Sequence, residues 1–164
     1  MNLCQESNLS QGANKADRVA VVTGAGSGIG KAAAIALIQD GWTVALLGRR
    51  REPLVQVLEE VESDASAYPV LCDVSMPEKV EEAFKYVVGR SGRVDLLFNN
   101  AGVGNPPGPF EAWSPKQWRD VVDINLNGMF YCLQQAFRIM KEQLPHGGRI
   151  INNGSISASV PFCC

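Results

Sequence analysis

A glycine-rich string between two apolar stretches is the first feature of the sequence that could do chemistry. Residues 23–30 read T-G-A-G-S-G-I-G, which places glycine at Gly24, Gly28 and Gly30. A β-branched run (18–23) precedes the string and an Ala-rich run with helical spacing (31–39) follows it, so we expect strand, turn and helix in that order. Small residues in this setting let phosphate oxygens reach the free N–H groups at the helix N-terminus. The string therefore predicts a pyrophosphate site, although a flexible turn or a tight helix start would use the same residues.

Alternating strand-like and helix-like runs would position this turn. Further strands are expected at 42–47, 68–72, 94–98 and 149–153, and further helices at 54–62, 76–88 and about 115–142. Repeated strand–helix units predict an α/β fold, a doubly wound parallel sheet of about five strands in the order 3-2-1-4-5. The first and fourth strands are neighbours in that order, so the loops after Thr23 and Phe98 should line the ligand cleft.

Composition is that of an ordinary globular protein. The 164 residues are 46% hydrophobic and 20% charged, with 15 Lys and Arg against 17 Asp and Glu. This balance gives no global basic field that would attract nucleic acid or an anionic membrane surface, and no apolar run approaches the ~20 residues of a membrane span. Five scattered cysteines without metal-ligand spacing predict no metal site and a reducing, cytoplasmic location.

The two ends of the chain differ in character from the middle. Residues 1–17 are polar and lack the apolar core of a signal peptide, so we expect a disordered leader. The domain is expected over 18–161, and 162–164 form an atypical tail. Paired C-terminal cysteines are lipidated in some small GTPases, but no GTPase feature accompanies Cys163 and Cys164.

Three motifs stand in a distinctive order. T-G-x-x-x-G-x-G is followed by Asp73-Val74 after the third expected strand and by Asn99-Asn100-Ala101-Gly102 after the fourth. This pattern resembles the short-chain dehydrogenase/reductase (SDR) family over nearly all of 18–161. The resemblance implies a Rossmann-type fold and an NAD(P)-dependent oxidoreductase acting on a small-molecule alcohol or carbonyl. It also implies that the helix at 115–142 makes homo- or hetero-dimer contacts.

The resemblance assigns cofactor contacts residue by residue. It implies that Gly24, Ser27, Gly28 and Ile29 wrap the pyrophosphate, that Asp73 and Val74 contact the adenine, and that Asn100, Ala101 and Gly102 lie along the adenosine ribose and the sheet centre. Simpler roles stay open for some of them. Asp73 could be the N-cap of the helix expected from Met76, and Asn100 could stabilise a turn.

The end of the second expected strand indicates which cofactor is bound. An acid there would bind the ribose hydroxyls of NAD, whereas arginine pairs with the 2′-phosphate of NADP. The sequence offers Arg49, Arg50 and Arg51. They could be a solvated basic stretch, but cations at a helix N-terminus oppose its dipole and a bound anion would relieve the conflict. We expect NADP rather than NAD, with Arg49 as the principal contact and Arg50 as the second.

For catalysis the resemblance implies Asn125, which would support a proton-relay water, and Ser155, which would bind the substrate oxygen. Without the family resemblance, Asn125 could be a solvent-facing helix residue and Ser155 could be an ordinary loop residue. The family tyrosine and lysine, spaced Y-x-x-x-K, should begin thirteen positions after Ser155, beyond Cys164. Tyr68, Tyr86 and Tyr131 do not precede a lysine by four positions.

We therefore expect the cofactor half of an oxidoreductase, catalytically impaired as these 164 residues stand. The sequence could be a fragment of a complete reductase or could carry an altered end from splicing, a frameshift or a misassigned gene end. The alternative function is a non-catalytic module that binds NADP or pairs with a full-length subunit. With either function, the fifth strand would be an incomplete sheet edge bearing Ile150, Ile151, Val160 and Phe162, which predicts marginal stability and poor solubility.

Overall fold

Strands and helices alternate along the chain in the order expected from the apolar runs. The computed structural model describes residues 18–61, 66–104 and 108–155. The elements are β1 (Val19–Thr23), α1 (Gly28–Gln39), β2 (Thr43–Gly48), α2 (Arg51–Glu60), β3 (Ala67–Leu71), α3 (Pro77–Ser91), β4 (Leu96–Asn99), the short turn η2 (Phe110–Ala112), α4 (Pro115–Val122), η3 (Asp123–Asn127), α5 (Gly128–Glu142) and β5 (Arg149–Asn152). Two predictions lie outside the described residues: the disordered leader at 1–17 and the atypical tail at 162–164.

The five strands form one parallel sheet with the order β3-β2-β1-β4-β5. This confirms the predicted α/β fold and the order 3-2-1-4-5. Thr23 of β1 is in register with Leu47 of β2, and Asn99 of β4 with Asn152 of β5. The strands therefore end together, and the loops that follow them emerge along the same edge of the sheet.

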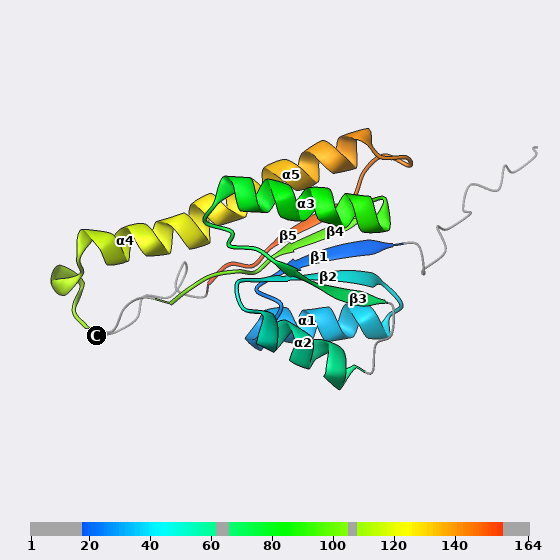
Figure 1. The fold of residues 1–164 in the computed structure, drawn as a ribbon. Helices are drawn as coiled ribbons and strands as arrows, with labels where there is room; N and C mark the ends of the chain where they lie inside the picture. Colours follow the sequence, from blue (N-terminus) through cyan, green and yellow to red (C-terminus); the bar gives the residue numbers. More distant parts are fainter. Residues whose placement is uncertain (1–17, 62–65, 105–107, 156–164) are drawn as a thin grey trace, which may run out of the picture.

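Helices cover both faces of the sheet. Figure 1 shows α1 and α2 on one face and α3 and α5 on the other. Side chains alternate between the faces of a strand, so Val21 packs in the core beneath α3 and α5 while Val22 packs in the core beneath α1 and α2. All five residues of β1 are buried, as expected for a central strand covered on both sides.

The prediction of a single helix over 115–142 is wrong in one respect. The helical path is divided by η3, a π-helical turn at Asp123–Asn127, which separates α4 from α5. A π turn inserts an extra residue into the helical repeat. The residues on α4 therefore face a different direction from the one that a continuous helix would give them.

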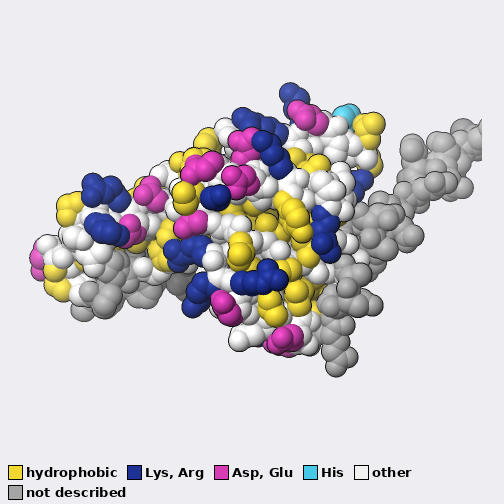
Figure 2. Space-filling model, in the orientation of Figure 1, with side chains coloured by type: hydrophobic (Ala, Val, Ile, Leu, Met, Phe, Trp, Pro, Cys, Tyr) yellow, Lys and Arg dark blue, Asp and Glu magenta, His cyan; other side chains and the backbone are white. Residues whose placement is uncertain are grey.

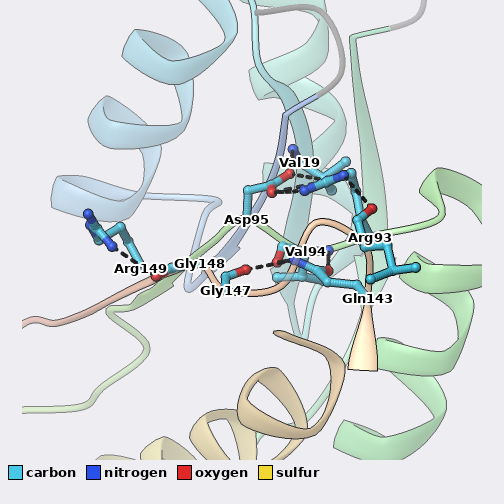
Figure 3. A network of polar contacts seen from close by, with 9 residues as sticks. Val19, Arg93, Val94, Asp95, Gln143, Gly147, Gly148 and Arg149 are labelled. Carbon is cyan, nitrogen blue, oxygen red and sulfur yellow. Dashed lines mark hydrogen bonds and ion pairs between the residues drawn. The ribbon is translucent and has the colours of Figure 1, made fainter. Parts of the chain in front are cut away.

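A polar network fastens the amino ends of the strands, opposite the loops described above (Figure 3). The Arg93 guanidinium donates to both carboxylate oxygens of Asp95, at 2.6–3.0 Å, and Asp95 also accepts the Val19 N–H at 2.9 Å. The Gln143 amide accepts the Val94 N–H at 2.9 Å and donates to the Val94 carbonyl at 3.0 Å. The network joins β1, the start of β4 and the end of α5.

The surface carries mixed charge on the face shown in Figure 2, where basic and acidic side chains are interspersed among hydrophobic ones. In the part of the chain that the structure describes, no helix is long and apolar enough to cross a membrane.

Candidate cofactor-binding site

The loops after β1 and β4 meet at Thr23. Its Oγ1 accepts the backbone N–H groups of Asn100 and Ala101, each at 2.9 Å, and donates to the Phe98 carbonyl at 3.4 Å. The Asn100 side-chain amide in turn donates to the Thr23 carbonyl at 3.1 Å. Sequence reasoning placed both loops at the cleft but did not identify this buried hydroxyl as their link. No local sequence signal identifies this link, because the partners of the hydroxyl lie 77 and 78 residues away along the chain.

Glycine is required at specific positions of the turn between β1 and α1. Gly24 and Gly28 have φ angles of +66° and +53°, in the left-handed region that favours glycine. A Cβ at Gly30 would overlap the Gly24 carbonyl oxygen and the Asn100 side-chain amide. Gly30 therefore allows α1 to begin directly against the turn. The first turn of α1 holds no acidic side chain, which suits an anion at this helix N-terminus.

A cavity of about 140 Å³ lies between these loops and the ends of β2 and β3. Of the residues proposed from the sequence, those lining it are Gly24, Ser27, Arg49, Arg50, Asp73, Val74, Ala101 and Gly102. Gly28, Ile29 and Asn100 do not line it: Ile29 is 63% exposed, and Asn100 lies behind the wall and holds the loops. Lining residues that sequence reasoning missed include Pro53, Leu54, Cys72 and Val103.

Two arginines stand at one end of the cavity. Arg50 is the N-cap residue of α2, and no side-chain hydrogen bond caps that helix. Arg49 lines both this cavity and an adjoining polar one of about 450 Å³, whose lining also includes Lys116, Asp120 and Asp123. Both arginine side chains are exposed. The start of α2 therefore carries three arginines, although its first turn also holds Glu52. An anion bound there would be held by the arginine charges and by the helix dipole.

Asp73 does not cap α3, so the capping role considered for it is wrong. Its Oδ1 accepts the N–H and the hydroxyl of Ser75, at 3.0 and 2.7 Å, and the N-cap residue of α3 is Met76. Asp73 stands too far ahead of the helix to reach its first N–H groups, and it stabilises the tight turn after β3 instead. Beside it, burial together with the Asp73 charge raises the pKa of the Cys72 thiol to about 12, so this cavity wall is a neutral thiol at pH 7.

Asn125 lies in the π-helical turn and binds the loop after β4. Its Oδ1 accepts the Val103 N–H at 2.8 Å, and its Nδ2 donates to the Val103 carbonyl at 2.9 Å. A Cβ on Gly102 would lie 3.3 Å from the same Oδ1. Although Asn125 is exposed, it is not the unattached solvent-facing residue considered as the alternative. Its side chain fixes the position of the loop that forms one wall of the cavity.

Ser155 lies just beyond the carboxyl end of β5 and is exposed. The segment leading to it is tied to the site, because the Asn153 side-chain amide donates to the Asn100 Oδ1 at 2.9 Å. The structure thus brings the exits of β1, β4 and β5 together at one edge of the sheet. Among residues 18–61, 66–104 and 108–155, no cluster of His, Cys, Asp and Glu could hold a metal ion.

The comparisons with known proteins identify a family. The family model for short chain dehydrogenase matches residues 18–164, and the chain belongs to the short-chain dehydrogenase family. It is 33% identical to a 3beta-hydroxysteroid dehydrogenase of Mediterraneibacter gnavus over 147 residues, covering 89% of this chain and 52% of that protein. It is 36% identical to levodione reductase of Leifsonia aquatica over 144 residues, covering 85% of this chain and 53% of that protein.

Solved structures agree with the sequence comparison. The 3-ketoacyl-(acyl-carrier-protein) reductase of Brucella melitensis, in a complex with NADH, superposes with a TM-score of 0.83 at 30% identity. The match covers 88% of this chain and 59% of that one. The chain spans about half the length of the curated relatives that it matches.

Proposed function

We propose that this chain is the NADP-binding half of an oxidoreductase that transfers hydride between the nicotinamide and a small-molecule alcohol or carbonyl. The observation that carries the proposal is the cavity itself. Its charged lining residues are Arg49, Arg50 and Asp73, and Asp73 is engaged by Ser75. The end of the cavity that Arg49 and Arg50 line has a net positive charge, which suits a phosphate. No acidic side chain lines the cavity at the end of β2, where it would repel a 2′-phosphate.

We propose that a dinucleotide would lie along the cavity in the following order. The pyrophosphate would lie at the glycine turn, against Gly24, Ser27, Gly28 and Ile29. Arg49 would bind the 2′-phosphate first and Arg50 second. Asp73 and Val74 would border the adenine, and Ala101 and Gly102 would lie along the ribose. Asn100, also expected there from the sequence, would act from behind the wall by holding their loop against Thr23. A Cβ at Gly30 would overlap the Gly24 carbonyl oxygen, so glycine at this position lets α1 begin against the turn where the pyrophosphate would lie.

The bound cofactor supplies the hydride, and the chain's own residues supply positioning. We propose that Ser155 donates a hydrogen bond to the substrate oxygen and that Asn125 supports a water near it. The sequence of 164 residues contains no Tyr-x-x-x-Lys. General acid–base assistance contributes ~10²–10⁴ in rate, so a polypeptide of these residues alone should bind NADP and reduce carbonyls slowly. A non-catalytic module that binds NADP or pairs with a full-length subunit is the second candidate, since Arg49, Arg50 and the glycine turn are all present in this chain.

Cofactor titration tests the proposal directly. We expect calorimetric titration of the 164-residue chain to show tighter binding of NADPH than of NADH. NADP+ should compete with NADPH, because both carry the 2′-phosphate. Equal affinity for the two reduced cofactors, or tighter binding of NADH, would remove NADP preference from the proposal. No binding of either would remove the cofactor function itself.

We also propose a dimer through α4 and α5, in the cytoplasm. No residue of α4 is buried, and Trp118, Leu126 and Phe130 are 54%, 57% and 52% exposed. Apolar side chains repeated along one helical path favour a protein contact. Cys72 and Cys132 are free thiols, which suits a reducing compartment. Sedimentation should show a dimer that Phe130→Asp converts to a monomer, and a monomeric parent chain would contradict this.

A further inference from the structure

The sequence contains two Asn-Gly pairs, Asn127-Gly128 and Asn153-Gly154. Asparagine is among the residues that are chemically labile in proteins. A glycine after it favours loss of the side-chain amide, because the glycine nitrogen can bond to the asparagine Cγ and no Cβ hinders closure of the resulting succinimide ring. A pair reacts only when its backbone can bring these two atoms together. The structure places the two pairs in different settings.

The Asn127-Gly128 pair is held in the helical path between η3 and α5. Asn127 has helical φ and ψ angles of −65° and −43°, and the Gly128 N–H donates to the Asp123 carbonyl. The Asn127 side-chain amide also donates to the Asp123 Oδ1 at 2.9 Å. Gly128 is buried, and a Cβ on it would lie 2.8 Å from a methyl carbon of Val74. This pair can therefore close a ring only after the helix opens locally.

The Asn153-Gly154 pair follows the end of β5 and lies outside helices and strands. Both residues are exposed. Beyond its chain neighbours, no atom of the described residues lies within 4 Å of the position that a Cβ on Gly154 would take. The Asn153 N–H donates to the Asn99 carbonyl at 2.8 Å, which fixes the chain on one side of the asparagine. On the other side, the Gly154 nitrogen has room to approach the Asn153 side chain.

We propose that Asn153 is a deamidation site of this chain and that Asn127 is protected. The Gly154 nitrogen bonds to the Asn153 Cγ, the Cγ–Nδ2 bond breaks, and the side-chain nitrogen leaves as ammonia with the proton of the attacking N–H. Water then opens the ring. Cleavage of the new Cγ–N bond gives aspartate, and cleavage of the original peptide bond gives isoaspartate, whose backbone runs through the former side chain. No oxidant or reductant takes part.

The modification would reach the candidate site through Asn100. The Asn153 side-chain amide donates to the Asn100 Oδ1 at 2.9 Å, and the Asn100 amide donates to the Thr23 carbonyl at 3.1 Å. A carboxylate accepts hydrogen bonds but cannot donate them, so after deamidation two acceptors face each other. Asn100 then turns its amide toward the carboxylate and releases Thr23, or the segment at 153 separates from Asn100. Both outcomes loosen the junction between the exits of β1, β4 and β5.

Peptide mapping by mass spectrometry tests the site, after incubation of the 164-residue chain in mildly alkaline buffer. We expect aspartate and isoaspartate to accumulate at position 153 about tenfold or more faster than at position 127, where the helix must open first. Gly154→Ala isolates the chemistry. Its Cβ has space and the φ of Gly154 lies outside the left-handed region, so the bond to Asn100 should persist while the methyl group slows ring closure.

Hydrogen exchange at the Asn100 and Ala101 amides tests the consequence. Asn153→Asp reproduces one product, and we expect it to speed exchange at both amides. Asn152→Asp is the matched control, because it adds the same charge one residue earlier. Asn152 uses its Oδ1 to accept the Asn99 amide at 3.0 Å, and an aspartate there keeps that acceptor, so exchange should stay close to that of the parent. Gly154→Ala should also exchange as the parent does.

Three results would overturn the proposal: equal rates at positions 127 and 153, a Gly154→Ala chain that deamidates at 153 as fast as the parent, or an Asn153→Asp chain whose two amides exchange no faster than those of Asn152→Asp. None of these measurements requires a bound cofactor. A chain that failed to bind NADPH would contradict the proposed function and leave the deamidation result standing.

Discussion

The Thr23 hydroxyl links the loops after β1 and β4 through a single atom, so removing it should disturb the whole candidate site. Thr23 is 1% exposed, and its Oγ1 accepts the N–H groups of Asn100 and Ala101 at 2.9 Å each. Thr23→Val keeps the shape of the side chain and leaves both donors without this acceptor. A buried donor without a partner costs about 1–3 kcal/mol, so two of them should lower the free energy of unfolding by about 2–6 kcal/mol. That is a large share of the ~5–15 kcal/mol typical of a domain.

Urea unfolding followed by circular dichroism measures this loss. Thr23→Ser retains the hydroxyl and should recover most of it. Thr43→Val is the matched control, because Thr43 begins β2 outside the cavity, and its effect should stay within about 0.5 kcal/mol. NADPH should also bind Thr23→Val less tightly than the parent, since the loop carrying Ala101 is one wall of the cavity. The reasoning is refuted if Thr23→Val and Thr43→Val unfold alike and bind NADPH alike.

Three further predictions follow from the charges and hydrogen bonds of the structure. Arg49→Gln should weaken NADPH binding by about 10- to 100-fold and leave NADH binding unchanged. This fold-change corresponds to the ~1.5–3 kcal/mol that a hydrogen bond to a charged group contributes. Arg51→Gln is the control, because Arg51 does not line the cavity, and it should change neither affinity. Burial raises the pKa of the Cys72 thiol from 9.0 to about 12, so its contribution to stability is complete below pH 9 and is lost as the pH rises from 9 toward 12. Cys72→Ala should therefore flatten the alkaline fall of the unfolding free energy measured in urea, and an unchanged slope would contradict the cause given. Gln143→Ala leaves the Val94 N–H and carbonyl without their partners and should cost about 1–3 kcal/mol with NADPH affinity unchanged; a variant as stable as the parent would show that water replaces the amide.

Much of the fold could be predicted from the sequence because its signals are local. Continuous apolar runs such as that of β2 mark strands buried on both faces, and the strand order then follows from right-handed crossovers. The predicted helix boundaries are less accurate where glycine or arginine begins a helix. The expected start of the first helix was Lys31, whereas α1 begins at Gly28, because two glycines of the motif already belong to the helix and their low helix propensity conceals its start.

The features that could not be predicted depend on contacts between distant residues. The π-helical turn at Asn125 interrupts a sequence whose apolar periodicity continues on both sides, and what distinguishes it is a pair of hydrogen bonds to Val103, 22 residues away. Thr23 lies 77 residues from Asn100, so nothing near it in the sequence shows that its hydroxyl has two donors to accept. Both cases follow from the same topology: adjacent parallel strands β1 and β4 are far apart in the chain, and the groups that join their exits become visible only when the sheet is assembled. A site built at such a junction is predictable as a location from strand order, while the atoms that hold it must be read from the structure.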